Sequence, residues 1–273
     1  MLNNQTEYQW VVGFIDGDGF LDLQRTKSHN VFYYKPVLAI TQKHFQILYK
    51  IRHILKIGRI SKRPDGYYHY RVQSQKLFHI HLIPIFKKYP FLSNKRLQFK
   101  LIIRCLKILK NYSGRDLQKQ NCLNQYNRWI KKVRHWPIQK PNAISAPWFV
   151  GFFESEGCIS VQQVSQSFRF VIKITQSERA LLIAIQDFLH IGRINKERQN
   201  IYYWGISRRK DLPKLISIFR KYPLKSEKSI QWKKFLKLIR IEKIFKKLPE
   251  GEEARPRKVH QRFQRLLLYF KKN

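Results

Sequence analysis

The chain has 273 residues, which is enough for one large domain or two small ones. It carries 55 Lys and Arg residues against 17 Asp and Glu residues, so its formal net charge is +38. A charge of this size favours a polyanionic partner, most simply the phosphate backbone of a nucleic acid. An anionic membrane is the competing partner, but no apolar run approaches the length of a spanning helix. Residues 1–9 contain no basic residue and no apolar h-region, so no targeting signal is visible.

The first predicted element is a helix whose sequence occurs twice. Residues 10–19 read WVVGFIDGDG, and residues 148–157 read WFVGFFESEG. Residues four apart share one helix face, and small residues there let a second helix backbone approach very closely. Each copy has such a pair. We therefore expect two helices that pack against each other through Gly13, Gly17, Gly151 and Ser155.

Both copies end in an acid followed by a glycine, Asp18-Gly19 and Glu156-Gly157. Glycine commonly ends a helix, but an acid is unfavourable there, because the C-terminus is the negative end of the helix dipole. Two such helices side by side would be stabilised by a cation, and Mg²⁺ prefers carboxylate ligands. The alternative is two core helices whose terminal acids are incidental. Asp16 and Glu154 lie roughly 200° further round their helices, and we expect them on the helix surface.

The segments that follow each motif also repeat in order, which indicates two half-domains. Ile40-Thr41-Gln42 returns as Ile174-Thr175-Gln176. Apolar periodicity in the first half predicts strands at 20–26 and 34–41, a helix at 45–55, strands at 59–62 and 67–73, and helices at 77–86 and 95–109. The second half is predicted to contain hairpins within 161–175 and 193–207, with helices at 180–189, 212–220 and 229–245. Further helices are predicted at 117–133 and, as either a packing or a DNA-touching element, at 259–272.

The two motifs resemble those of single-chain LAGLIDADG homing endonucleases, and the resemblance covers most of the chain. It implies an α+β fold of two pseudo-symmetric αββαββα half-domains, with saddle-shaped antiparallel sheets and the paired motif helices at the centre. The expected boundaries are 1–112 for the N-terminal half-domain, 113–146 for a linker, 147–248 for the C-terminal half-domain and 249–273 for a basic C-terminal tail.

The resemblance implies site-specific hydrolysis of both strands of DNA with two or three divalent ions, Mg²⁺ with Mn²⁺ as a substitute. Two alternatives stay open. One is an RNA-binding maturase of a group I intron, and the other is a DNA-binding descendant that no longer cleaves. The intact Asp18 and Glu156 argue against the second alternative, since a non-cutting protein has no need for both acids.

The resemblance also assigns roles to single residues. Asp18 and Glu156, with Gly17 and Ser155 beside them, are the expected metal ligands. Gln42 and Gln176 match a glutamine that orders active-site water. Lys95 and Lys228, each five residues after the proline of a repeated Lys-Tyr-Pro segment, match a lysine that stabilises charge or polarises water, with a phosphate contact as the alternative. The family often has a basic residue four positions after the glutamine, where this chain has Gln46 and Ala180.

DNA reading is expected from the hairpin strands, because an antiparallel ribbon fits the major groove and alternate residues face it. Counting from the metal-ligating acids, the residues predicted to face DNA are Gln24, Thr26, Lys35, Arg63, His69 and Arg71 in the first half, and Gln162, Arg169, Lys173, Asn195 and Tyr203 in the second. Each has a plain solvent-facing role as its alternative.

Matched reading positions differ between the halves, which predicts an asymmetric double-stranded target of about two helical turns. Because a linker joins the halves in one chain, we expect a monomer. The resemblance implies an organelle, mitochondrion or chloroplast, and leaves group I intron RNA open as a second partner.

Overall fold

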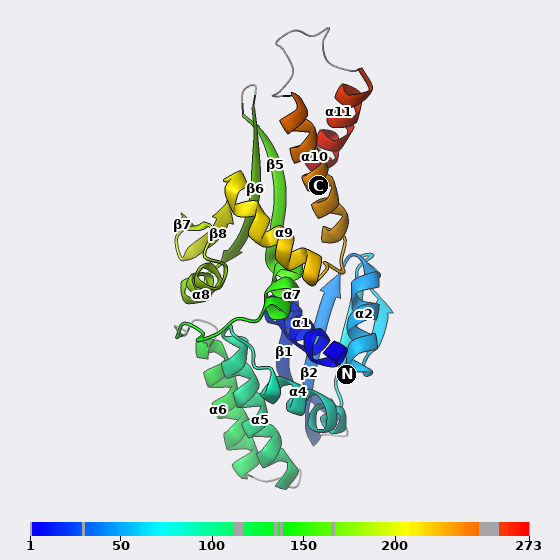
Figure 1. Cartoon of the computed structure of the whole chain (residues 1–273). Helices are drawn as coiled ribbons and strands as arrows, with labels where there is room; N and C mark the ends of the chain where they lie inside the picture. The colour runs from blue at the N-terminus through cyan, green and yellow to red at the C-terminus, as the bar shows by residue number, and fades with distance from the viewer. Residues whose placement is uncertain are drawn as a thin grey trace.

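The computed structural model describes residues 2–28, 31–111, 117–133, 136, 139–164, 167–245 and 257–272. Figure 1 shows an elongated molecule with α1 (Leu2–Asp18) and α7 (Ala146–Glu156) side by side at its centre. The N-terminal half lies on one side of this pair and the C-terminal half on the other. The predicted α+β arrangement with paired motif helices is thus confirmed.

The first half contains every element predicted for it. After α1 come β1 (Gly19–Ser28), β2 (Val31–Gln42), α2 (Phe45–Leu55), β3 (Arg59–Lys62) and β4 (Tyr68–Val72). The helix predicted at 77–86 is longer and irregular, and consists of α3 (Gln75–Leu77), the π-helical turn η1 (Phe78–Leu82) and α4 (Ile83–Lys88). The wider turn contains Ile80, four residues before Pro84, whose ring would clash with the Ile80 carbonyl in a regular helical turn. The half ends with α5 (Lys95–Asn111).

The second half repeats this order. It contains β5 (Gly157–Val164), β6 (Ser167–Gln176), α8 (Arg179–Leu189), β7 (Arg193–Arg198) and β8 (Ile201–Ile206). A short 3₁₀ turn, η2 (Arg209–Asp211), leads into α9 (Leu212–Lys221), and α10 (Lys228–Phe245) follows. The predicted hairpins and helices are therefore all present, with ends that differ by a few residues.

The two antiparallel sheets have the same strand order, β1-β2-β4-β3 and β5-β6-β8-β7. Their registers also correspond, since Gly19 pairs with Ile40 as Gly157 pairs with Ile174. Arg71 pairs with Ala39 in one sheet, and Gly205 pairs with Lys173 in the other. A residue of one half can therefore be matched to its counterpart by register alone.

The close approach of α1 and α7 depends on the predicted small residues. A Cβ atom at Gly13 would overlap the carbonyl oxygen of Trp148, and one at Gly151 would overlap the carbonyl oxygen of Trp10. One turn closer to the helix ends, a Cβ atom at Gly17 would overlap the side chain of Ser155. At Gly13 and Gly151, both backbones would have to move apart to accept any side chain.

Two outer helices extend the pseudo-symmetry. In the linker, α6 (Leu117–Val133) packs on α5, and the Tyr126 hydroxyl accepts the Leu23 N–H over 3.0 Å and donates to Asp22 over 2.7 Å. In the tail, α11 (Arg257–Lys272) contacts α10 and β5, with Phe263 edge-on to Phe168. This supports the packing role for the terminal helix. The expected boundaries near residues 112 and 248 lie outside the described residues.

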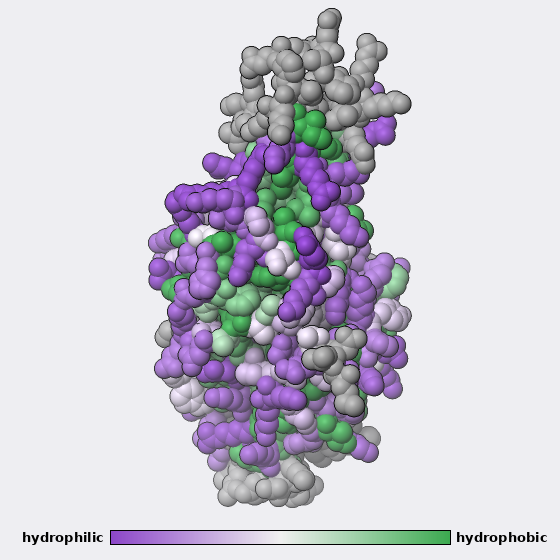
Figure 2. Space-filling view, in the orientation of Figure 1, coloured by the Kyte–Doolittle hydropathy of each residue, from purple (hydrophilic) through white to green (hydrophobic). Residues whose placement is uncertain are grey.

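Each sheet has one face covered by helices, for example where Phe235 of α10 meets Phe170 of β6, and one face open to solvent. Hydrophilic residues cover most of the side of the molecule seen in Figure 2, over both half-domains. In the part of the chain that the structure describes, no helix is long and apolar enough to cross a bilayer.

Candidate active site

The predicted catalytic residues gather where α1 and α7 end side by side. Asp18 is solvent exposed and Glu156 is partly buried. The Gln42 amide, at the end of β2, donates to Asp18 over 2.6 Å. Gln176 holds the same position in β6 and hydrogen-bonds to Glu156. Four residues far apart in the sequence thus form one cluster.

Both carboxylates are destabilised as ions. Although Asp18 can be reached by solvent, the protein packed around its carboxylate raises its pKa by desolvation, which the bond from Gln42 and two nearby lysines oppose. Burial also raises the pKa of Glu156, and the negative charge of Asp18 adds to this effect. Each ion therefore disfavours the other, and a bound cation would relieve both effects.

Lys95 and Lys228 lie against the same helix ends. The Lys95 ammonium donates to the carbonyl oxygens of Asp16 and Gly17 over 2.6 and 2.7 Å. The Lys228 ammonium donates to those of Glu154 and Ser155 over 2.6 and 3.2 Å. Burial lowers the pKa of both lysines, and nearby carboxylates oppose this. In this geometry each ammonium neutralises the negative end of a motif helix.

The prediction that Asp16 and Glu154 lie on the helix surface is wrong, because both are buried, with exposed fractions of 2% and 4%. Asp16 accepts the Leu92 N–H over 2.6 Å and the hydroxyl of Ser93. Glu154 accepts the N–H groups of Lys225 and of Ser226, the latter over 2.6 Å. Burial raises the pKa of both acids, and these hydrogen bonds oppose the rise.

These two acids anchor the loops that carry the lysines. The loops share the pattern Pro-x-x-Ser-x-Lys, at residues 90–95 and 223–228. The repeated serine two positions before each lysine is the sequence pattern that could have indicated these buried acids. A buried hydroxyl and buried loop N–H groups need a hydrogen-bond acceptor. Asp16 and Glu154 therefore set where Lys95 and Lys228 enter the site.

The tryptophans of the two motifs differ although their positions match. The Trp10 indole N–H donates to Glu154 over 2.7 Å. The Trp148 indole nitrogen is buried and has no hydrogen-bond partner among the described residues. Glu154 has one methylene more than Asp16, its counterpart in α1, and only the longer side chain satisfies an indole of the opposite helix.

The sequence did not predict two polar contacts that join the two half-domains beside the site. Glu178, at the start of α8, accepts the Asn94 N–H with both carboxylate oxygens at 3.2 Å. At the matched positions, the His44 side chain lies 2.9 Å from the carboxylate of Glu227. Burial is the main cause that raises the pKa of Glu178 to about 7. No local pattern reveals such pairs, because each joins segments far apart in the sequence.

Of the residues predicted to face DNA in the first half, Arg63 lies just after β3, with its guanidinium 3.0 Å from the Asp65 carboxylate, and the others lie on the open face of the sheet. Gln24 pairs with Lys35, and Arg71 and His69 line a hollow that also includes Asp18. The Arg71 guanidinium donates to the Gln24 side chain over 3.0 Å. Arg59, opposite Arg71, belongs to the same face but was not predicted.

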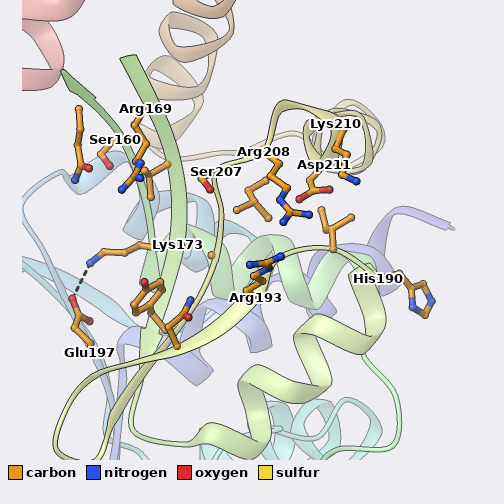
Figure 3. A pocket seen from close by; sticks show the side chains of 18 residues that line it. Ser160, Arg169, Lys173, His190, Arg193, Glu197, Ser207, Arg208, Lys210 and Asp211 are labelled. Atoms are coloured by element: carbon orange, nitrogen blue, oxygen red, sulfur yellow. Dashed lines mark hydrogen bonds and ion pairs between the residues drawn. The ribbon is translucent and has the colours of Figure 1, made fainter. Parts of the chain in front are cut away.

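In the second half, all five predicted residues line one groove about 600 Å³ in volume along the open face of the sheet. Arg193, Arg208 and Lys210 line it as well and were not predicted. Figure 3 shows Arg169, Arg193 and Arg208 around the same space, with Lys173 bonded to Glu197 nearby. Contact with DNA stays a prediction for the residues of both faces.

The donors at the helix ends fit a hard cation. Among the described residues, no group of three or more His, Cys, Asp or Glu side chains could hold a metal ion. Mg²⁺ usually takes one or two protein carboxylates and completes its shell with water and phosphate oxygens. The carbonyl oxygens of Gly17 and Ser155 lie beside the two carboxylates, and each accepts one lysine bond, which leaves a second lone pair.

Paired helix ends with two acids, between two open sheets rich in basic and amide side chains, define a two-motif endonuclease fold. The sequence model of the LAGLIDADG endonuclease family matches residues 11–106 and 149–239, which is more than half of the chain. The chain belongs to this family.

Relatives and solved structures agree with this assignment. The "Probable intron-encoded endonuclease Cox1-I1b" of Schizosaccharomyces pombe is 27% identical, over 94% of this chain and 70% of that protein. The "Probable intron-encoded endonuclease aI3" of Dictyostelium citrinum is 28% identical, over 86% of this chain and 96% of that protein. The structure of the LAGLIDADG meganuclease I-AabMI bound to uncleaved DNA has a TM-score of 0.77, with 26% identity over 94% of this chain and 98% of that one. For I-LtrWI bound to target DNA the TM-score is 0.82, with 18% identity over 97% of each chain.

Proposed function

We propose that this protein is a metal-dependent homing endonuclease that cuts both strands of DNA at one long, asymmetric site. The observation that carries the proposal is the pair of carboxylates, Asp18 and Glu156, at the adjoining ends of the motif helices. They lie between two open sheet faces with many donors for phosphates and bases. The names of the relatives and the DNA-bound structural neighbours support the same activity.

Asp18 and Glu156, with the carbonyls of Gly17 and Ser155, would hold two or three Mg²⁺ ions, for which Mn²⁺ substitutes. Such ions activate a water nucleophile and neutralise charge on the phosphate oxygens. Gln42 and Gln176 orient the carboxylates through their amide N–H groups, and their carbonyl oxygens are left to order water. Lys95 and Lys228 each neutralise the negative end of one motif helix and add positive charge beside the phosphate that is cut.

The finer features of the proposal follow from the chain itself. The twofold arrangement is completed within one chain, so the protein acts as a monomer on a site of roughly two helical turns. Relatives named after introns and a relative from Saccharomyces cerevisiae named "Uncharacterized mitochondrial protein RF1" support an organelle as its location. Binding of a group I intron RNA is the alternative function, and it is compatible with an intact nuclease site.

The test is cleavage of a library of randomised duplexes in the presence of Mg²⁺, followed by sequencing of the cut products. Wild type should enrich one site. Asp18→Asn and Glu156→Gln should each abolish cleavage of that site while binding survives, because the metal ions serve the transition state more than docking.

Gel-shift binding in Ca²⁺ provides the control that both variants still fold and recognise the site. Either single variant cutting at nearly the wild-type rate would contradict the proposed roles of the acids. Tight binding to a structured intron RNA without any cut duplex would favour the maturase alternative.

A further inference from the structure

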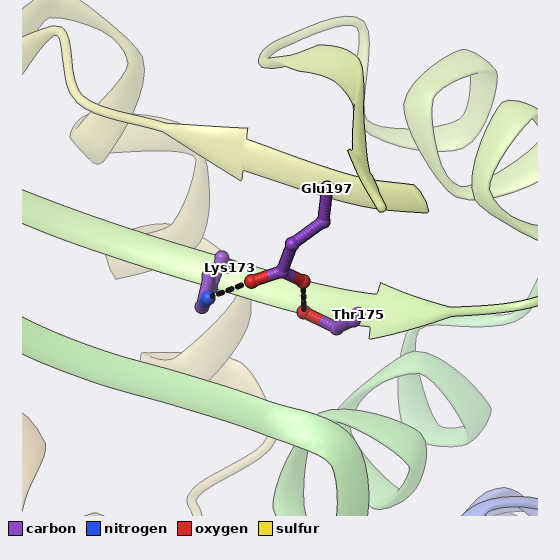
Figure 4. A network of polar contacts seen from close by, with 3 residues as sticks. All are labelled: Lys173, Thr175 and Glu197. Carbon is purple, nitrogen blue, oxygen red and sulfur yellow. Dashed lines mark hydrogen bonds and ion pairs between the residues drawn. The ribbon is translucent and has the colours of Figure 1, made fainter. Parts of the chain in front are cut away.

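Two acids, Glu197 and Asp211, line the groove of the second half that is proposed to bind DNA, and Glu197 is held in a fixed arrangement on the sheet. Lys173 of β6 donates to Glu197 of β7 over 3.0 Å, and the Thr175 hydroxyl donates to the other Glu197 oxygen over 3.1 Å. Figure 4 shows the three side chains together, and the contact spans β8, which lies between β6 and β7 in the sheet. The Lys173 and Glu197 side chains are 34% and 37% exposed, so a ligand on this face can reach both.

A carboxylate on this surface weakens the attraction of the protein for phosphate, so its presence calls for a functional explanation. The chain has 55 basic and only 17 acidic residues, and a phosphate near Glu197 would be repelled. The hydrogen bond from Lys173 is the main cause that lowers the pKa of Glu197, so the acid stays ionised. A permanent negative charge here is suited to the edges of bases, which carry hydrogen-bond donors, and not to the backbone.

The arrangement belongs to the second half alone. By register, Lys173 matches Ala39 of the first half. Glu197, at a bulge of β7, matches Arg63, just after β3, by its distance along the sequence from Arg193 and Arg59. The lysine is further held by Tyr203, whose ring centre is 5.7 Å from its ammonium. The pair is therefore not a general feature of both half-domains, and its geometry is set before any ligand arrives.

The Lys173 ammonium and the Glu197 carboxylate are about as far apart as the acceptor and donor groups on the major-groove edge of one base pair. In a G·C pair, the guanine O6 acceptor and the cytosine N4 donor are hydrogen-bonded to each other, so they lie about 3 Å apart in the major groove. The Lys173 ammonium has three donors, and each Glu197 oxygen has two lone pairs, so both keep capacity beyond their mutual bond.

We propose that Lys173 and Glu197 together read a single G·C base pair, with Lys173 on guanine O6 and N7 and Glu197 on cytosine N4. This specificity rests on the proposed DNA endonuclease function. A T·A pair in the same orientation also presents an acceptor and a donor, but it lacks the second acceptor and places a methyl group beside Lys173. The reversed pairs, C·G and A·T, present a donor to the lysine and an acceptor to the acid.

The position of the pair in the target follows from the register. Lys173 pairs with Cys158, which is two residues after Glu156. The specified base pair therefore lies in the half-site bound by the C-terminal half-domain, close to the cut.

The test uses the full-length protein and the site enriched from the duplex library. Each position of that site is replaced by all four base pairs, and binding in Ca²⁺ and cleavage in Mg²⁺ are measured. The half-site of the C-terminal half-domain is the one whose preferences change in Arg169→Ala. Wild type should specify one G·C pair in that half-site near the cut, with T·A second and a loss of roughly 5-fold to 150-fold for the reversed pairs.

The decisive variant exchanges the two residues, Lys173→Glu with Glu197→Lys. It keeps an ion pair across the same strands, so thermal unfolding should change little, and it should invert the preference to C·G at that one position. Glu197→Gln, whose amide both donates and accepts, should flatten the preference there. The matched control is Arg63→Ala, at the sequence position of the other half-domain that corresponds to Glu197, which should alter only the opposite half-site.

An exchange variant that keeps the wild-type order of preferences at every position would overturn the inference, and cleavage of the same site by wild type would still support the proposed function. If wild type enriches and cuts no duplex, the proposed function fails, and the inference fails with it.

Discussion

At the scale of single residues, the interface between the motif helices departs from twofold symmetry at its two tryptophans. Trp10 donates to Glu154, while the buried indole nitrogen of Trp148 has no partner among the described residues. A buried polar group without a partner retains its desolvation cost, whereas a hydrogen bond to a charged group is among the stronger ones. Matched sequence positions thus make unequal contributions to stability.

Substituting each tryptophan with phenylalanine should therefore have unequal effects. Trp10→Phe leaves Glu154 without one donor and should lower the free energy of unfolding by about 1–3 kcal/mol more than Trp148→Phe does. Both changes remove a similar ring volume, so each variant is the control for the other. Urea unfolding followed by far-UV circular dichroism measures the difference, and equal losses would contradict it.

Glu178 predicts how the stability of the metal-free protein depends on pH. Its pKa is about 7 in the folded protein, against an ordinary value of 4.5, so the folded state holds the proton more tightly. Below pH 4.5 the Glu178 carboxyl is protonated in both states and does not lower the free energy of unfolding. As the pH rises from 4.5 to 7, its ionisation in the unfolded state lowers the stability of the fold. Glu178→Gln cannot ionise, and at pH 8 it should be more stable than wild type by up to about 3 kcal/mol.

Chemical unfolding with a chelator present, at pH 5 and at pH 8, measures this effect. The gain should be much smaller at pH 5, because the wild-type carboxyl is then largely protonated in the folded state. A gain of the same size at both pH values would show that packing, and not ionisation, separates glutamine from glutamate at this position.

At the scale of elements, the α1–α7 pair is the contact that both half-domains depend on. Gly13→Ala or Gly151→Ala should lower the free energy of unfolding by more than about 3 kcal/mol, since the new methyl group meets backbone atoms that cannot rotate away. Cleavage should fall in parallel, because the two carboxylates would move apart.

Gly66→Ala is the control for a glycine whose surroundings are open. It has a φ of +83° but no atom within 4 Å of a new Cβ, so backbone strain alone should cost about 1 kcal/mol. Unfolding midpoints of the three variants compare the two effects. A Gly13→Ala protein as stable as Gly66→Ala would show that the helices can separate without cost.

The elements were largely predictable because their signals are local. Apolar periodicity and the repeated Ile-Thr-Gln segments placed the strands and helices, and alternation along the strands placed Gln24 and Lys173 on the open faces. The partners of Asp16, Glu178 and Glu197 were not predictable in this way. Each lies across a contact between distant segments, and only the folded backbone decides which loop or strand an acid meets.

At the scale of the whole molecule, the chain has one pseudo-twofold arrangement and two different open faces. The first half presents Arg63 where the second presents Glu197, and Lys35 where the second presents Arg169. The surface that would form a symmetric dimer is already used between α1 and α7. A net charge of +38 also disfavours self-association.

We therefore expect a monomer that protects an asymmetric DNA site of roughly two turns. Light scattering of the free protein should give the mass of one chain, and footprinting of the enriched site should give unlike half-sites. An obligate dimer, or a footprint with perfect twofold symmetry, would contradict the single-chain arrangement.

Because the indole N–H groups of Trp10 and Trp148 differ in hydrogen bonding, they also provide spectroscopic probes of the centre of the molecule. An indole N–H bonded to a carboxylate resonates downfield of one without an acceptor, so Trp10 and Trp148 should give two separate proton signals from adjoining helices. Either signal can be assigned by its loss in the corresponding phenylalanine variant. The junction of the two halves can then be followed by nuclear magnetic resonance without an added label, one helix at a time.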